Sequence, residues 1–336
     1  MRQPPPLNAL PRYPVVGGIG LLALAVSLAY WSKKVDVSPL MEDHEIREGQ
    51  VWRLVTSTLP HGDPIHLAFN LLWLWVLGTL IEEVFGHVRT FLLILLLAAG
   101  SGAADYAFSH GGIGLSGVGY GLFGFLWVLS KRNARFRGAV DAQTVQLFVG
   151  WFFLCIVLTA AKVWHVANVA HGVGALLGVV LGMTVAGGAL RPLYGAVTAL
   201  LLAASGAAVY ARPYVNLTVE RAYERADLGR QAFDERRYED AARHWRAAIA
   251  VTNGRPPESA WWFNLGLAYE RQKNYAAAKY AYGRALEMDP DEKDYQDAAE
   301  SVESLLKLKQ TVKAIEAGRA RASEKERQAD THPVDE

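Results

Sequence analysis

Long apolar stretches alternate with short polar segments over roughly the first 210 residues, and the pattern then stops. Seven of these stretches approach the roughly 20 residues that an α-helix needs to cross a bilayer. They cover residues 15–31, 65–84, 88–108, 115–129, 145–161, 163–185 and 194–211. The fourth is short for a span, and the seventh is rich in Ala and Gly. The pattern predicts an all-α fold, a polytopic membrane bundle followed by a soluble part.

The soluble part repeats one helical pattern. Residues 259–269 read Ser-Ala-Trp-Trp-Phe-Asn-Leu-Gly-Leu-Ala-Tyr, and the Leu-Gly pair at 265–266 also occurs 37 residues earlier, at 228–229. This resembles a pair of tetratricopeptide repeats, whose period is about 34 residues, with a short insertion at 254–257. Two repeats are few for a stack that stands alone. We therefore expect a third helix, at about 294–319, to cap them.

These features divide the chain into five parts. We expect a cytoplasmic N-terminal segment (1–13), a membrane domain (14–187), an additional transmembrane helix (188–212), the repeat domain with its capping helix (213–322) and a disordered tail (323–336).

Charge and cysteine content constrain the class of protein. The net charge of +1 gives no strong attraction to nucleic acid. The single cysteine, Cys155, lies in an apolar stretch, which excludes an intrachain disulfide and a thiolate cluster. The short loops carry eight Lys and Arg on one side against five on the other, which predicts a cytoplasmic N-terminus. We expect a multi-pass protein of a bacterial inner (plasma) membrane. Seven spans place the repeats on the outer side, whereas six would leave them in the cytoplasm.

Four polar residues fall at one depth of the predicted bundle. His66 and Asn70 are four residues apart at the start of the second stretch, so they share a helix face. Ser116 opens the fourth stretch among glycines, and His171 lies in the first turns of the sixth. All three stretches run from outside to inside. Ionisable groups at membrane depth are costly and face the interior of a bundle, so we expect these residues to converge below the outer surface.

This set of residues suits acyl transfer. Ser116 would be the nucleophile and His171 its general base, attacking a carbonyl group. The oxyanion would be met by His66, by the Asn70 side-chain amide and by the Ser116 backbone amide. Taken alone, Ser116 would indicate close helix packing, because small residues gather where membrane helices touch.

Three neighbours have predicted supporting roles. Gly114 leaves the backbone free to shape the oxyanion pocket. Tyr120, one turn below Ser116, can hold the imidazole ring by stacking. Asp105 is the nearest acidic residue at this level, although it is a weak candidate for orienting His171.

The motifs and their order resemble a rhomboid intramembrane serine protease. The chain has Gly-x-Ser-Gly at 114–117, His-x-x-x-Asn at 66–70 and Ala-His-x-x-Gly-x-x-x-Gly at 170–178, on alternate predicted spans. Trp52-Arg53 in the first outer loop is similar to that family's loop signature. The resemblance covers about residues 14–187, with no departure at the motif positions.

The resemblance implies a six-helix core with a Ser116–His171 dyad that has no third member, and an oxyanion site of His66, Asn70 and Ser116. It also implies cleavage of single-span membrane proteins at a helix-breaking point of their transmembrane segment. Water would reach the dyad from the outer side, and substrate would enter from the lipid past the fifth span and the loop at 162–165. The repeat domain would bind the soluble part of a substrate or a protein or peptide partner.

Two other functions are compatible with parts of this pattern. A proteolytically inactive adaptor would bind transmembrane clients and recruit partners through its repeats, although it would have no reason to keep both Ser116 and His171. A metal site could use the histidines of the outer half, but the chain has no His-Glu-x-x-His and no carboxylate at ligand spacing. We therefore expect no metal and no cofactor.

Overall fold

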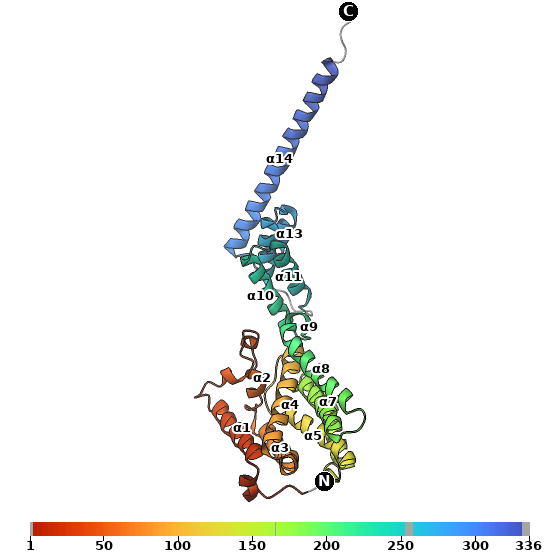
Figure 1. Cartoon of the computed structure of the whole chain (residues 1–336). Coiled ribbons are helices and arrows are strands. Elements are labelled where there is room, and N and C mark those ends of the chain that lie inside the picture. The colour runs from red at the N-terminus through yellow and green to blue at the C-terminus, as the bar shows by residue number, and fades with distance from the viewer. Residues whose placement is uncertain (1–2, 165, 253–257, 331–336) are drawn as a thin grey trace, which may run out of the picture. The chain divides into compact units, whose positions relative to one another are not determined.

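A computed structural model describes residues 3–164, 166–252 and 258–330, which are helical apart from turns and loops (Figure 1). The chain divides into two compact units, Met1–Thr218 and Val219–Glu336. The described residues contain no strand. This confirms the predicted all-α fold of a membrane bundle followed by helical repeats.

Among the described residues, six helices of the first unit are long and apolar enough to cross a membrane. They are α1 (Pro14–Ser32), α3 (Pro64–Phe85), α4 (His87–Phe108), α6 (Ala142–Ala160), α7 (Asn168–Ala186) and α8 (Arg191–Tyr210). Each corresponds to a predicted span. The predicted fourth span is α5 (Ser116–Arg132), whose 17 residues fall short of the others. The short helices η1 (Leu7–Arg12) and η4 (Ala134–Phe136) flank the bundle.

The sixth span begins later than the predicted residue 163. Lys162 adopts a left-handed backbone conformation with φ 58°, which ends the helical path of α6. The backbone N–H groups of Val163 and Trp164 then both donate to Leu158 O, so these residues form a turn and α7 starts at Asn168. Residue 165 of the predicted entry loop lies outside the described residues.

Helix α5 packs against α7 more extensively than any other two described helices pack. The contact is between backbones, because a Cβ at Gly174 would overlap Gly117 O and a Cβ at Gly178 would overlap Gly121 O. Both pairs advance in the same chain direction, so α5 and α7 run parallel. The glycines of the motif at 170–178 therefore bring the start of α5 level with the start of α7.

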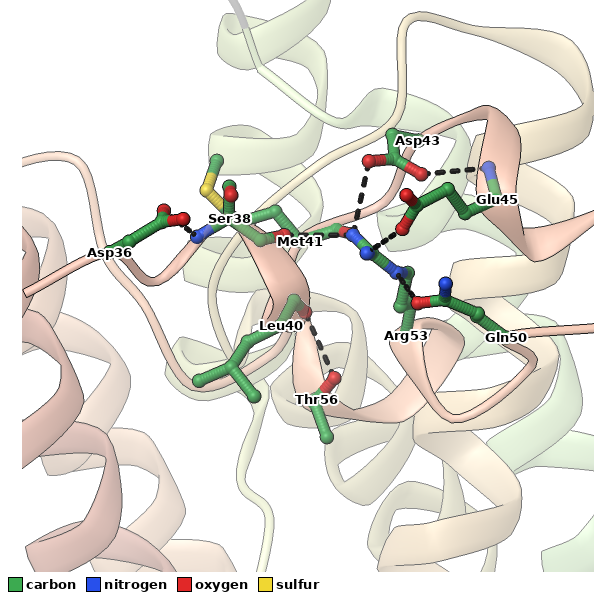
Figure 2. A network of polar contacts seen from close by, with 9 residues as sticks. All are labelled: Asp36, Ser38, Leu40, Met41, Asp43, Glu45, Gln50, Arg53 and Thr56. Atoms are coloured by element: carbon green, nitrogen blue, oxygen red, sulfur yellow. Dashed lines mark hydrogen bonds and ion pairs between the residues drawn. The ribbon is translucent and has the colours of Figure 1, made fainter.

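The predicted outer loop between α1 and α3 contains short helices of its own. It contains η2 (Ser38–Leu40), η3 (His44–Ile46) and α2 (Arg53–Thr56). Arg53 is 3% exposed. Its guanidinium donates to two backbone carbonyls, Ser38 O at 2.8 Å and Met41 O at 3.0 Å. It also donates to three side chains: Asp43 Oδ2 at 3.0 Å, Gln50 Oε1 at 2.8 Å and Glu45 (Figure 2). The Arg53 guanidinium thus connects the parts of this loop by hydrogen bonds.

The first unit extends six residues past the predicted boundary at 212. A short helix, α9 (Arg212–Val215), follows α8. The Arg212 side chain lies over the Tyr106 ring and donates to Tyr106 O and Ser109 O. Asn216 Nδ2 donates to Ser109 O at 2.7 Å, and Leu217 N–H to Phe108 O. These bonds satisfy carbonyl groups at the C-terminal end of α4, which a helix cannot satisfy by itself.

The second unit consists of α10 (Glu220–Asp234), α11 (Tyr238–Ala250), α12 (Ser259–Arg271), α13 (Tyr275–Met288) and α14 (Lys293–Asp330). Each helix pair meets at a glycine: Gly229 lies against the Trp245 ring and Gly266 against the Tyr282 ring. These glycines are the ones that indicated the repeat in the sequence. The insertion at 254–257 lies outside the described residues.

The capping helix is longer than predicted. Helix α14 runs as one continuous helix to Asp330, through residues 323–330 that were expected to belong to a disordered tail (Figure 1). This part of the sequence is rich in Ala, Glu, Lys and Arg, which are strong helix formers, and it contains no proline. Residues 331–336 of the predicted tail lie outside the described residues.

Candidate active site

Ser116 is the first residue of α5 and is half-buried. A helix of this length spans about 25 Å, which is less than the roughly 30 Å of a bilayer's hydrocarbon core. Lys131 and Arg132 occupy its last turn and suit the inner membrane surface. With Lys131 and Arg132 at the inner surface, Ser116 at the other end would lie below the outer surface, and this depth stays a prediction.

His171 lies in the first turn of α7 and is 3% exposed. Its ring stacks on the Tyr120 ring with centroids 4.5 Å apart and an interplanar angle of 25°. The Tyr120 hydroxyl donates to Phe148 O of α6 at 3.1 Å, which fixes the phenol ring in turn. His171 Nδ1 has no hydrogen-bond partner among the described residues. The tyrosine thus contacts the imidazole in the way that its position one turn below Ser116 predicted.

The His66 imidazole lies against Gly114, in the segment that leads to Ser116. A Cβ at Gly114 would lie 2.7 Å from His66 Cε1 and 3.0 Å from its Nε2, and Gly114 itself has φ +102°. Both facts require glycine at this position. Asp63 caps α3 by accepting from the N–H groups of Ile65 and His66, each at 2.9 Å, and so fixes the first turn that carries the imidazole.

Asn70 lies one turn further along α3 and is 9% exposed. Its Nδ2 donates to His66 O at 3.0 Å, which leaves the second amide hydrogen for another acceptor. The structure therefore brings His66 and Gly114 together, and holds Asn70 on the same face of α3. The roles of these residues in binding an oxyanion stay predictions.

His61 is a site neighbour that the sequence pattern did not single out. It is fully buried, and its Nε2 accepts from the N–H of Leu115, the residue before Ser116, at 3.3 Å. Nδ1 lies 2.9 Å from Leu59 O and must carry the proton of the neutral ring. Burial, and then the neighbouring His66, lower the pKa of His61 to about 4. The ring lies 5.0 Å from that of His66, edge to face.

Asp105 does not orient the His171 ring. Its Oδ1 instead accepts from the backbone N–H of Ala170, the preceding residue, at 3.2 Å. The weak prediction that Asp105 orients the imidazole directly is therefore wrong, because the carboxylate reaches the backbone of α7 rather than the side chain.

A small cavity lies beside Ser116. It measures about 20 Å³, enough for one water molecule, and is lined by Ser116, Gly117, Gly114, Ser57, Asp105 and Glu42 among others. Within the part of the chain that the structure describes, no three His, Cys, Asp or Glu side chains gather closely enough to hold a metal ion.

Comparison with known proteins gives two domain matches. Residues 48–188 match the rhomboid domain, and residues 226–293 match the tetratricopeptide repeat. A stretch of 128 residues is 34% identical to the "Rhomboid protease GlpG" of Enterobacter sp. (strain 638). That stretch is 36% of this chain and 46% of the relative, so the match spans slightly less than half of the relative's length.

Proposed function

We propose that this chain, which carries a rhomboid domain followed by tetratricopeptide repeats, is an intramembrane serine endopeptidase. Six apolar helices together with the rhomboid domain make it a multi-pass integral membrane protein, and the bacterial relative fits a location in a bacterial inner membrane. The observation that carries the proposal is the glycine contact between α5 and α7. It brings the helix that begins with Ser116 against the first turns that hold His171.

In the proposed reaction, His171 takes the proton of the Ser116 hydroxyl as Oγ attacks the carbonyl carbon of the scissile peptide. The resulting oxyanion accepts hydrogen bonds from His66, from Asn70 Nδ2 and from the Ser116 backbone N–H. His171 then gives its proton to the leaving amine as the C–N bond breaks. Water attacks the acyl-enzyme in the same way, with His171 again taking the proton, and releases the second product.

The dyad in this proposal has no acidic third member. His171 Nδ1 has no hydrogen-bond partner among the described residues, and the stacked Tyr120 ring restrains the imidazole instead. Substrate would be a single-span membrane protein cut in or near its transmembrane segment. The substrate would enter the bundle from the surrounding lipid, and its cleaved bond would meet Ser116 below the outer surface.

The repeat domain would bind the soluble part of a substrate or another protein. We infer its side of the membrane from the first unit. Residues 212–217 are bonded to the C-terminal end of α4, the same end from which the chain continues to Ser116. The chain therefore leaves the bundle on the face to which the nucleophile segment belongs, and we place the repeats on the outer side.

Cleavage by the purified protein tests this proposal. The full chain is reconstituted in liposomes with a single-span substrate, and wild type is compared with Ser116→Ala and His171→Ala. We expect wild type to cleave and to label with a serine-directed phosphonate, and both variants to lose cleavage by at least about a thousandfold. A wild-type protein that neither cleaves nor labels would support the inactive adaptor instead.

A further inference from the structure

Helix α7 begins without a cap from its own chain segment. Its N-cap residue is Ala167, whose side chain accepts no hydrogen bond. The first N–H groups of a helix have no partner inside the helix, and they are usually satisfied by a nearby side-chain oxygen. In α3 and α6, Asp63 and Asp141 supply that oxygen from the adjoining loop. His171 lies in this first turn of α7, which has no cap from the adjoining loop.

Asp105 fills this gap from another helix. It lies near the C-terminal end of α4 and is 1% exposed. Its Oδ1 accepts from the Ala170 N–H, so the carboxylate caps α7 across the helix interface. A negative charge at a helix N-terminus is also favoured by the helix dipole. The capped residue directly precedes His171.

The second oxygen of Asp105 borders the nucleophile loop. Oδ2 is buried without a hydrogen-bond partner among the described residues, and Asp105 lines the cavity that Ser116 and Gly117 also line. A Cβ at Gly112 would lie 2.9 Å from Oδ2. One carboxylate thus contacts the first turn of α7 and borders the loop that leads to Ser116.

Glu42 of the outer loop lines the same cavity as Asp105. Glu42 Oε2 accepts from the Gly112 N–H at 3.0 Å, and Ser57 Oγ donates to Oε1 at 3.3 Å. Burial, and then the Asp105 carboxylate, raise the pKa of Glu42 well above its usual value, against a smaller opposing effect of Arg212. The outer loop and the loop that leads to Ser116 therefore both border the cavity that Asp105 lines.

We propose that Asp105 is a positioning residue for the protease: by capping α7 from α4, it sets the place of His171 relative to Ser116. The inference rests on the proposed function, since it assigns Asp105 a part in that reaction. It gives Asp105 no contact with the substrate.

Three variants test whether Asp105 caps α7, because they separate the charge of the Asp105 side chain from its hydrogen bond to the Ala170 N–H. Asp105→Ala removes the acceptor, and kcat should fall by about ten- to a hundredfold, as expected for a small misplacement of a catalytic group. KM should stay within about twofold, because no substrate contact is lost. Asp105→Asn keeps an oxygen that can accept from the Ala170 N–H, so its kcat should recover to within about threefold of wild type. The control is Asp141→Ala, which removes the cap of α6, where Asp141 accepts from Thr144 N at 2.8 Å.

The measurements are kcat and KM on the reconstituted substrate, phosphonate labelling of Ser116, and the thermal unfolding midpoint in detergent. Asp141→Ala should lower the midpoint about as much as Asp105→Ala and leave kcat unchanged. A wild-type kcat in Asp105→Ala would overturn the inference, and so would an equal loss of kcat in Asp105→Asn and Asp105→Ala. Both outcomes require an active wild type, so they are distinct from a failure of the proposed function.

Discussion

At the scale of single residues, the assignment of the oxyanion donors is the part of the proposed mechanism that a single substitution tests most directly. Asn70→Ala removes one amide donor from the face of α3 that also carries His66. We expect cleavage to slow by about ten- to a thousandfold, the range for losing one such donor. The fold should persist, because the only bond that Nδ2 makes among the described residues is to His66 O in its own helix.

The control for Asn70 is Thr79→Val in the same helix. The Thr79 hydroxyl donates to Trp75 O one turn back, as Asn70 does to His66 O, and is also buried but lies far along α3 from Ser116. Initial rates over a range of substrate concentrations distinguish the two variants. Asn70 has no part in the mechanism if its alanine variant cleaves as fast as Thr79→Val.

His61 predicts a dependence of stability on pH. Its pKa is about 4 in the folded protein, whereas an unfolded histidine has a pKa near 6.5. Between these values the unfolded chain binds a proton that the folded protein excludes, so stability is fully present above about pH 6.5 and falls as the pH drops toward 4. The size of this loss is on the order of 3 kcal/mol.

Thermal unfolding in detergent at about pH 7.5 and about pH 4.5, on either side of the ordinary histidine pKa, measures this loss. His61→Gln has no titrating ring at this position, so its unfolding midpoint should fall less between the two pH values than that of wild type. His44→Gln, which replaces an exposed histidine of the outer loop, should behave as wild type does. Equal losses in wild type and His61→Gln would show that His61 does not exclude the proton.

At the scale of helices, the backbone contact between α5 and α7 leaves no space for a side chain at its glycines, so adding one should destabilise the bundle. Gly178→Ala places a Cβ onto Gly121 O, so the helices must separate and overpacking should cost about 1–3 kcal/mol or more. The loss would occur although alanine is the better helix former by about 1 kcal/mol. Activity should fall with stability, because the same contact aligns Ser116 with His171.

Gly119→Ala on α5 provides the matched control. A Cβ there would meet nothing within 4 Å, so this variant should be as stable as wild type or slightly more so. Unfolding midpoints and cleavage rates of both variants give the comparison. The backbone contact does not stabilise the bundle if Gly178→Ala unfolds at the same temperature as Gly119→Ala.

Periodicity explains why the helices were predictable and their loops were not. The glycines at 174, 178 and 182 recur every four residues, so a touching face of α7 followed from the sequence. The bond from Leu115 N–H to His61 joins residues 54 positions apart in two loops, where no period applies. The bond from Ala170 to Asp105 depends on the packing of α4 against α7 in the same way. The start of α7 at Asn168 was missed because four of the five residues at 163–167 are apolar, and composition cannot distinguish such a connection from a helix.

At the scale of the whole molecule, the number of spans decides where the repeats can act. Helix α8 is 20 residues long and apolar, and the segment after it is bonded through Arg212 and Asn216 to the C-terminal end of α4, which we propose is its outer end. Both buried side chains would be left without these partners if the segment crossed back to the inner side. We therefore predict that a thiol introduced into the repeat unit reacts from outside intact cells.

Gln310→Cys in α14 is suited to this test, because the residue is exposed. The native Cys155 is buried within α6 and is replaced by serine in every variant compared. A membrane-impermeant maleimide should label Gln310→Cys in intact cells, and should label Arg135→Cys, in the predicted cytoplasmic loop after α5, only once the cells are broken. The opposite pattern would place the repeats in the cytoplasm, where they could reach only the inner part of a substrate. Outer labelling would instead confine their partners to the side from which water reaches Ser116.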